Sequence, residues 1–141
     1  VTVSVGEQEL GVPDATLERY RVLPSYNGRT VAMGMRSEDL HPAALRPDLP
    51  RLTARLELVE ALGSETIAFF RIDARTVRSG AGATGDAVED VVGEEGIAAA
   101  RPNLVASFPP RVTLRIGDDV EMGVDVEHAH FFDEETGAAL R

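Results

Sequence analysis

Two apolar runs joined by a short hinge constrain the fold of this chain more than any other feature, and they occupy residues 51–73. In the first run apolar and polar residues alternate, which is the period of a strand with one solvated face. Its apolar members are Leu52, Ala54, Leu56 and Leu58. The second run is apolar on both alternating faces, because Ile67 and Phe69 lie between Ala68 and Phe70. It predicts a strand covered on most of both sides, with Gly63 in the turn between the two runs.

A helical interpretation of the first run must be weighed against the strand. Leu52, Leu56 and Val59 recur at i, i+4 and i+7, and the run consists largely of good helix formers. The second run favours strands, because β-branched and aromatic residues dominate it and a strand needs a partner for its backbone hydrogen bonds. We therefore predict a β-hairpin.

Shorter strands are expected on both sides of this hairpin. The first two are separated by a turn, Pro13 ends the second, and Asn27-Gly28 predicts a type I′ turn before the third. The expected strands cover residues 1–5, 10–12, 29–35, 103–108, 112–116 and 120–126. Many short strands separated by turn residues indicate an all-β protein with a closed or nearly closed barrel.

The connections are predicted less sharply. Residues 14–26 allow either one helical turn, with Leu17, Tyr20 and Leu23 on one face, or a loop. In residues 36–50 three prolines exclude a regular element of any length, although Ser37 can cap a single turn. Residues 74–102 are rich in alanine and glycine, and the part from 79 to 98 is acidic, so we expect a mobile insertion there. The G-x-G-x-x-G match at 80–85 has no βαβ context and predicts only a flexible loop.

Composition excludes several classes of function. The 141 residues fit one domain, and no apolar run reaches the roughly 20 residues that a membrane span needs. All 14 basic residues are arginine, so a P-loop lysine is missing and this chain cannot hold the nucleotide site of an ATPase. The net charge of −10 argues against nucleic acid. Because the chain opens on an alternating strand without methionine or a signal peptide, we expect it to be cut from a longer protein.

Metal binding and acid/base chemistry are possible but disfavoured from the residues. His128 and His130 would share one face of a strand, with Glu127 or Asp125 nearby. Zinc needs three or four ligands from different elements, and His41 is the only other histidine in the sequence. The absence of cysteine removes thiolate sites. Glu60 and Glu65 flank the hinge, where carboxylates are usually solvated or paired with arginines such as Arg36 or Arg55. We expect no catalytic, cofactor or metal site.

Three segments resemble one family, in order and spread over about 110 residues. Residues 59–66, VEALGSET, resemble the V-E-x-L-G-x-E-T segment in the accessory C-terminal domain of ATP-binding subunits of sugar ABC importers, the maltose and glycerol-phosphate transporter type. Residues 33–40, MGMRSEDL, resemble its G-I-R-P-E-x-L, with Ser37 in place of the usual proline. Residues 130–137, HFFDEETG, followed by Leu140, resemble its closing H-x-F-D-x-x-T-G-x-x-L. The insertion at 79–98 departs from the shorter connection usual in that family.

The resemblance implies a TOBE domain with an OB-like or MOP-like barrel, without activity of its own. It implies that the ATPase domain, with ATP and magnesium, lies upstream. The partners would be a second ATP-binding subunit, the permease subunits and in some members a regulatory protein, at the cytoplasmic face of the membrane. The alternative is a small-oxyanion or small-ligand binding module of the molybdate-binding type.

Several residues of the three segments are expected in structural or interface roles. Phe131 and Phe132 are adjacent, so on a strand only one can enter a single core, and the other would stay near the surface. We predict contact regions at the hinge 60–66 and the closing segment 132–137. The candidates are Arg36, Glu38, Glu60, Gly63, Glu65, Phe132, Asp133 and Gly137.

Overall fold

A computed structural model describes residues 1–76 and 102–141. The predicted insertion at 79–98 and the glycine motif inside it lie outside the described residues. Within the described residues, no helix combines the length and the apolar character that crossing a membrane requires.

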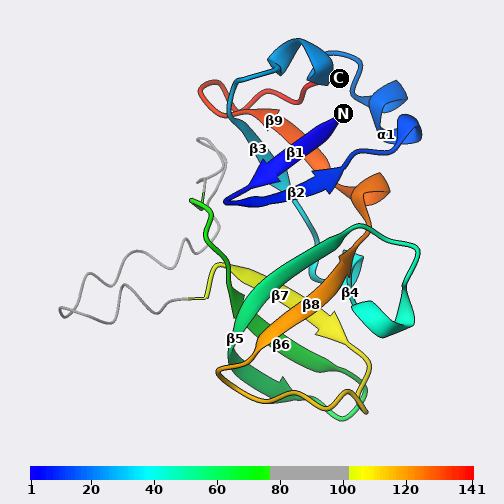
Figure 1. Cartoon of the computed structure of the whole chain (residues 1–141), viewed down its shortest axis with the longest axis vertical. Coiled ribbons are helices and arrows are strands. Elements are labelled where there is room, and N and C mark those ends of the chain that lie inside the picture. Colours follow the sequence, from blue (N-terminus) through cyan, green and yellow to red (C-terminus); the bar gives the residue numbers. More distant parts are fainter. Residues whose placement is uncertain (77–101) are drawn as a thin grey trace, which may run out of the picture.

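The lower half of the structure is a five-stranded antiparallel sheet curled into a barrel (Figure 1). Its strands run in the order β4-β8-β5-β6-β7. β7 lies beside β4 and beside the 3₁₀ turn η2 (Ser37–Asp39), but no ladder joins β7 to β4, so the barrel is nearly closed. The bounds are β4 Leu40–Pro42, β5 Arg51–Ala61, β6 Thr66–Arg71, β7 Leu104–Phe108 and β8 Asp119–Val124. The predicted all-β, OB-like barrel is confirmed.

The remaining strands form two ribbons above the barrel and do not enter its wall (Figure 1). One pairs β1 (Thr2–Val5) with β2 (Gln8–Gly11), and the other pairs β3 (Val31–Gly34) with β9 (His130–Asp133). They enclose a core continuous with that of the barrel, which contains Leu10, Tyr20 and Phe131, each at most 1% exposed. The sequence did not predict these separate ribbons, whose short strands bury their apolar faces on one another instead of joining the barrel wall.

Polar contacts fasten this upper part to the barrel. The Gln8 side-chain amide accepts from the backbone N–H of Thr53 and donates to its carbonyl, both at 2.7 Å, as a neighbouring strand would. The helix α1 (Asp14–Arg19) is held to η5 (Val126–His128), because Arg19 donates to the carbonyls of Glu127 and Ala129. Residues 14–26, for which the sequence left helix and loop open, form α1 and then the 3₁₀ turn η1 (Leu23–Tyr26).

The central hairpin is confirmed as β5 and β6, but with one change of face. A bulge lies between Leu56 and Leu58, so the alternation reverses there. Leu56 is fully buried, whereas Leu58 is 47% exposed and faces outward. Strict alternation could not show this, because one extra residue in a strand moves all later side chains to the other face. On β6, Ile67 and Phe69 are half-buried.

Four local predictions were wrong. Residues 112–116 form no strand, although Val112 and Leu114 still pack on the core. Val126 belongs to η5 rather than to the preceding strand. A short strand, β4, does occur among the prolines, because Pro42 lies at the end of an edge strand, where a missing donor is tolerated. Ser37 does not cap η2, whose N-cap residue is Arg36 without a side-chain hydrogen bond.

The turn at Asn27-Gly28 is also of a different type from the one predicted. Asn27 has φ −52° and ψ 126°, Gly28 has φ 76°, and Arg29 N donates to Tyr26 O at 2.8 Å, which defines a type II turn. A type I′ turn suits the twist of two strands in a hairpin. Here the turn joins η1 to β3, so that requirement is absent.

One side chain holds the two ends of the segment that leaves and re-enters the barrel between β6 and β7. The Oδ1 atom of Asn103 accepts from Ile72 N at 2.8 Å, and its Nδ2 donates to the carbonyls of Ile72 and Ala74 at 2.8 and 3.0 Å. Asn103 N also donates to Phe70 O at 2.9 Å. The ends are thus fixed by local contacts within the described residues.

Replacing Asn103 with alanine should lower the free energy of unfolding by about 1–3 kcal/mol, because part-buried backbone groups of Ile72 and Ala74 lose their partners. Deleting residues 79–98 should change stability much less, because the cost of closing a loop varies only slowly with its length. Urea unfolding of both variants measures this. A deletion as harmful as the alanine substitution would contradict the expectation.

Candidate functional surface

The closing segment forms a tight turn built on Asp133, the last residue of β9. Its Oδ1 atom accepts from the backbone N–H groups of Glu135 and Thr136 at 2.9 and 2.8 Å. Its own carbonyl accepts from Gly137 N at 2.9 Å, and Gly137 has φ 72°, a region where side chains are disfavoured. The chain then returns beside β9, and Leu140 is buried with its N–H donating to Phe131 O at 3.0 Å. The closing motif therefore specifies a turn.

The second carboxylate oxygen of Asp133 ties this turn to the segment before β3. Tyr26 donates its hydroxyl to Oδ2 at 2.7 Å, and Arg29 Nη2 lies 4.0 Å away. Arg29 also lies over the Tyr26 ring, 4.3 Å from its centroid. The hydroxyl of Tyr26 and then the N–H of Thr136 lower the pKa of Asp133 from 3.8 to about 2. The hydrogen bond to Asp133 in turn raises the pKa of Tyr26.

The two adjacent phenylalanines separate as predicted. Phe131 is fully buried and meets the Tyr20 ring edge-on, with centroids 5.4 Å apart at 78°. Phe132 points away from that core and is half-buried beside His130, with ring centroids 6.4 Å apart. A side chain at Gly34 would touch the Phe132 ring at 3.5 Å. Phe132 therefore rests on a glycine of β3 at the edge of the upper part.

A cleft of about 1020 Å³ opens beside this turn. Its walls come from β1, β3, residues 72–76, the start of β7 and the closing turn. The described lining carries four carboxylates, at Asp73, Asp133, Glu134 and Glu135, and one arginine, Arg75, which pairs with Glu134. This charge balance opposes an anion and gives no support to the oxyanion alternative.

The other predicted residues lie elsewhere on the surface. Arg36 and Glu38 approach to 3.8 Å with side chains 69% and 70% exposed, so their ion pair contributes little to stability. In the hinge, Gly63 has φ 83° and Leu62 N donates to Glu65 O at 2.9 Å. Glu65 accepts from the Ser107 hydroxyl, and Glu60 is exposed. Within the described residues neither glutamate pairs with Arg36 or Arg55.

The structure does not bring the two predicted contact regions together. The hinge 60–66 lies at the lower end of the barrel and the closing segment 132–137 lies at the top, at opposite ends of the long axis (Figure 1). Phe132, Asp133 and Gly137 lie at one end, and Glu60, Gly63 and Glu65 lie at the other. One compact patch cannot contain both sets.

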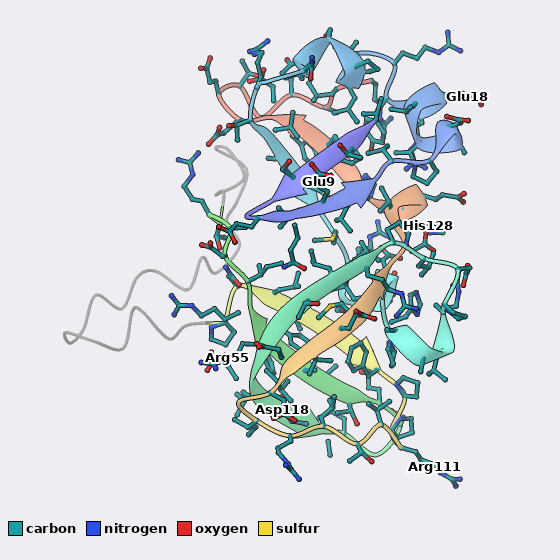
Figure 2. All side chains as sticks on the ribbon, in the orientation of Figure 1. Glu9, Glu18, Arg55, Arg111, Asp118 and His128 are labelled. Atoms are coloured by element: carbon teal, nitrogen blue, oxygen red, sulfur yellow. The ribbon has the colours of Figure 1, made fainter. Side chains whose placement is uncertain are left out.

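The histidines do not share a strand, contrary to the prediction. His128 ends η5, beside the top of the barrel (Figure 2), and its Nδ1 lies 2.9 Å from Asp125 Oδ2. His130 begins β9, and its Nδ1 lies 3.2 Å from the Tyr20 hydroxyl. The described residues contain no group of three or more side chains that could hold a metal ion.

Sequence reasoning missed Tyr26, Asn103 and Ser107, the partners that fix these surfaces. The three residues are 107, 31 and 42 positions from the groups that they bind, Asp133, Ile72 and Glu65. Nothing in the local sequence reports contacts over such separations. For Asn103 alone, an amide just before an apolar strand is a weak signal.

The sequence is similar to ATP-binding subunits of importers for oligosaccharides. The oligosaccharides import ATP-binding protein MsmX of Bacillus subtilis is 23% identical over 142 residues, which cover 99% of this chain and 31% of MsmX. The trehalose/maltose import ATP-binding protein MalK of Thermococcus litoralis is 29% identical over 119 residues, which cover 82% of this chain and 25% of MalK. The chain thus spans about a quarter to a third of these relatives. No protein-family model matches it.

Replacing Asp133 with asparagine should destabilise the chain at neutral pH and much less in acid. The pKa of Asp133 is about 2 in the folded chain and near 3.8 ordinarily, so its contribution is complete above pH 4 and disappears as pH falls toward 2. Urea unfolding at pH 7, 4 and 3 should therefore show the difference between the two proteins shrinking. Glu38→Gln is the control and should have little effect at any pH. A constant Asp133→Asn difference would contradict the assignment.

Proposed function

We propose that this chain is an accessory domain of the ATP-binding subunit of a sugar or glycerol-phosphate ABC importer. The observation that carries the proposal is the similarity to MsmX over 99% of the chain, supported by the similarity to MalK. The three sequence segments that resemble the TOBE domain of such subunits point in the same direction. In this proposal the domain is not an enzyme and works at the cytoplasmic face of the membrane.

The chemistry of the whole subunit would reside in another domain. A nucleotide site of the P-loop kind needs a lysine, and this sequence has none. ATP and magnesium would bind an upstream ATPase domain, which would also contact the permease subunits. The barrel contributes a rigid body attached to that domain, and its surfaces are available for a second subunit and for a regulatory protein.

The mechanical role that we propose is to hold two subunits together while their nucleotide domains open and close. Two barrels can do this with a weak contact, because tethering raises the effective concentration of one barrel near the other. A rigid surface favours such a contact, since less entropy is lost on binding. Two segments have such a rigid surface. They are the turn that Asp133 fixes beside Phe132 and the hinge that is held by the hydrogen bond between Glu65 and Ser107.

The 141-residue chain should show no saturable ATP binding by calorimetry in the micromolar range, with or without magnesium. The reason is the missing P-loop lysine. The matched measurement uses the full-length subunit, in which binding should appear and should be lost when its own P-loop lysine is replaced. Micromolar binding to the 141-residue chain would show that it is not an accessory domain.

The isolated chain should self-associate weakly, and more strongly as salt is added. Each copy carries a net charge of −10, so repulsion between copies is large at low ionic strength and is screened at high ionic strength. Sedimentation of the chain at low and at high salt, at protein concentrations up to about 1 mM, measures the effect. Phe132→Ser tests the closing segment. A strict monomer under all these conditions would remove the support for a pairing role.

A further inference from the structure

The outer wall of the barrel carries an apolar row that stays accessible to solvent. Leu58 of β5 lies opposite Phe69 of β6, and Phe69 lies opposite Val105 of β7. Leu58 is 47% exposed, Val105 is 39% exposed and Phe69 is half-buried. We call these three side chains the apolar row. Adjacent exposed apolar side chains on three neighbouring strands form a continuous patch, and such patches mark interaction surfaces.

Charges of opposite sign lie on the two sides of the apolar row. Toward the upper part of the molecule, Arg55 lies opposite Arg71, and both are exposed. Toward the hinge, Glu60 lies opposite Ile67, and Ile67 lies opposite Ser107, which is hydrogen-bonded to Glu65. Along the strands the wall is therefore basic, then apolar, then acidic. Figure 2 labels Arg55 on this wall.

Folding stability does not account for this arrangement. Like charges directly opposite on paired strands, such as Arg55 and Arg71, are destabilising. Asp119 of β8 lies in register on the other side of Arg55, but no ion pair joins them, and within the described residues neither arginine has an ion-pair partner. Two arginines that have no ion-pair partner among residues 1–76 and 102–141, placed beside an apolar row, suit a partner that brings carboxylates and apolar groups in the matching order.

We propose that this wall binds the same wall of a second copy of the chain, with the two-fold axis running along the apolar row. The proposal rests on the proposed function and names the surface that would carry it. Rotation about that axis reverses the strand direction but keeps β5 over β5. Leu58 and Phe69 then meet their own equivalents, and Arg55 of each copy faces Glu60 of the other.

The charges select this axis over the alternative. An axis parallel to the strands would place the arginine row of one copy over the arginine row of the other, which is repulsive. The chosen axis instead creates two equivalent Arg55–Glu60 pairs around an apolar centre. Both residues are exposed, so the pairs set the register but add little affinity, and screening of the net charge still dominates the response to salt. Glu60 is also the first residue of the hinge 60–66, so the proposed interface includes one end of the hinge. It does not include the closing segment 132–137.

The shape of the wall sets the strength of the contact. Sheets pack about 10 Å apart, a gap that side chains of the size of leucine and phenylalanine fill. A barrel wall is convex, so two such walls meet over a narrow strip and the isolated chain binds its copy weakly. Tethering by the nucleotide domains would supply the missing affinity.

Single cysteines test the axis, because the sequence contains none. Leu58→Cys lies near the axis and should be linked to itself in the second copy by a bis-maleimide that spans about 10 Å, roughly tenfold faster than an exposed cysteine away from the wall at concentrations approaching millimolar. The matched control is Ile116→Cys, at a loop residue that is 58% exposed. An equimolar mixture of Arg55→Cys and Glu60→Cys should be cross-linked by the same reagent faster than either variant alone. Equal rates for Leu58→Cys and Ile116→Cys would overturn the proposal.

Charge reversal tests the pairing itself, at two exposed positions where the fold should tolerate the change. Arg55→Glu and Glu60→Arg should each reduce the dimer fraction in sedimentation, and the double variant should restore it, because the pair is re-formed with reversed sign. Urea midpoints of all three variants check that folding is unchanged. No rescue in the double variant would overturn the proposed register.

The outcomes separate this proposal from the function on which it rests. A wild-type chain that dimerises, but responds to Phe132→Ser and not to the wall variants, would overturn the wall as the contact and leave a pairing role intact. A wild-type chain that stays monomeric to about millimolar would overturn both. Dimerisation that is lost on either charge reversal and regained in the double variant would support both.

Discussion

The structure depends on the long strand β5, which changes its partner partway along its length. β5 pairs with β8 through residues 51–55 and with β6 through residues 55–61, so it must bend to close the barrel. The bulge after Leu56 supplies that bend and at the same point turns the following side chains over. The same bulge therefore allows the barrel to close and places Leu58 on its outer wall.

The sequence predicted those features that a local pattern can encode. The hairpin, the all-β barrel and the separation of Phe131 from Phe132 follow from alternation and turn residues, and the structure agrees. The bulge could not be predicted from the sequence, because one extra residue in a strand leaves the local composition unchanged. The split into a barrel and two ribbons was missed for a similar reason: Thr2–Val5 alternates as a barrel strand does, and the partner of such a strand is chosen by tertiary packing.

The candidate residues also divide into those that a sequence motif indicated and those whose contacts depend on tertiary packing. Asp133 and Gly137 were singled out through a resemblance, and the structure gives the physical reason, since one carboxylate organises a turn and binds Tyr26 across 107 positions. That Glu65 contacts Ser107 rather than an arginine could not be predicted, because the pairing depends on the register of β6 with β7. The surface formed by β5, β6 and β7 can be recognised only when two registers are known together, that of β5 with β6 and that of β6 with β7.

The Asn103 clamp has a consequence for how this domain can be altered. The chain leaves the barrel after Ile72 and Ala74 and re-enters at Asn103, and the three residues are bound to one another. Foreign sequence inserted between them would therefore join the barrel through two ends that hydrogen bonds already hold close together. A fluorescent protein or a second binding module inserted there would be carried on two short connections and would therefore follow the position of the barrel.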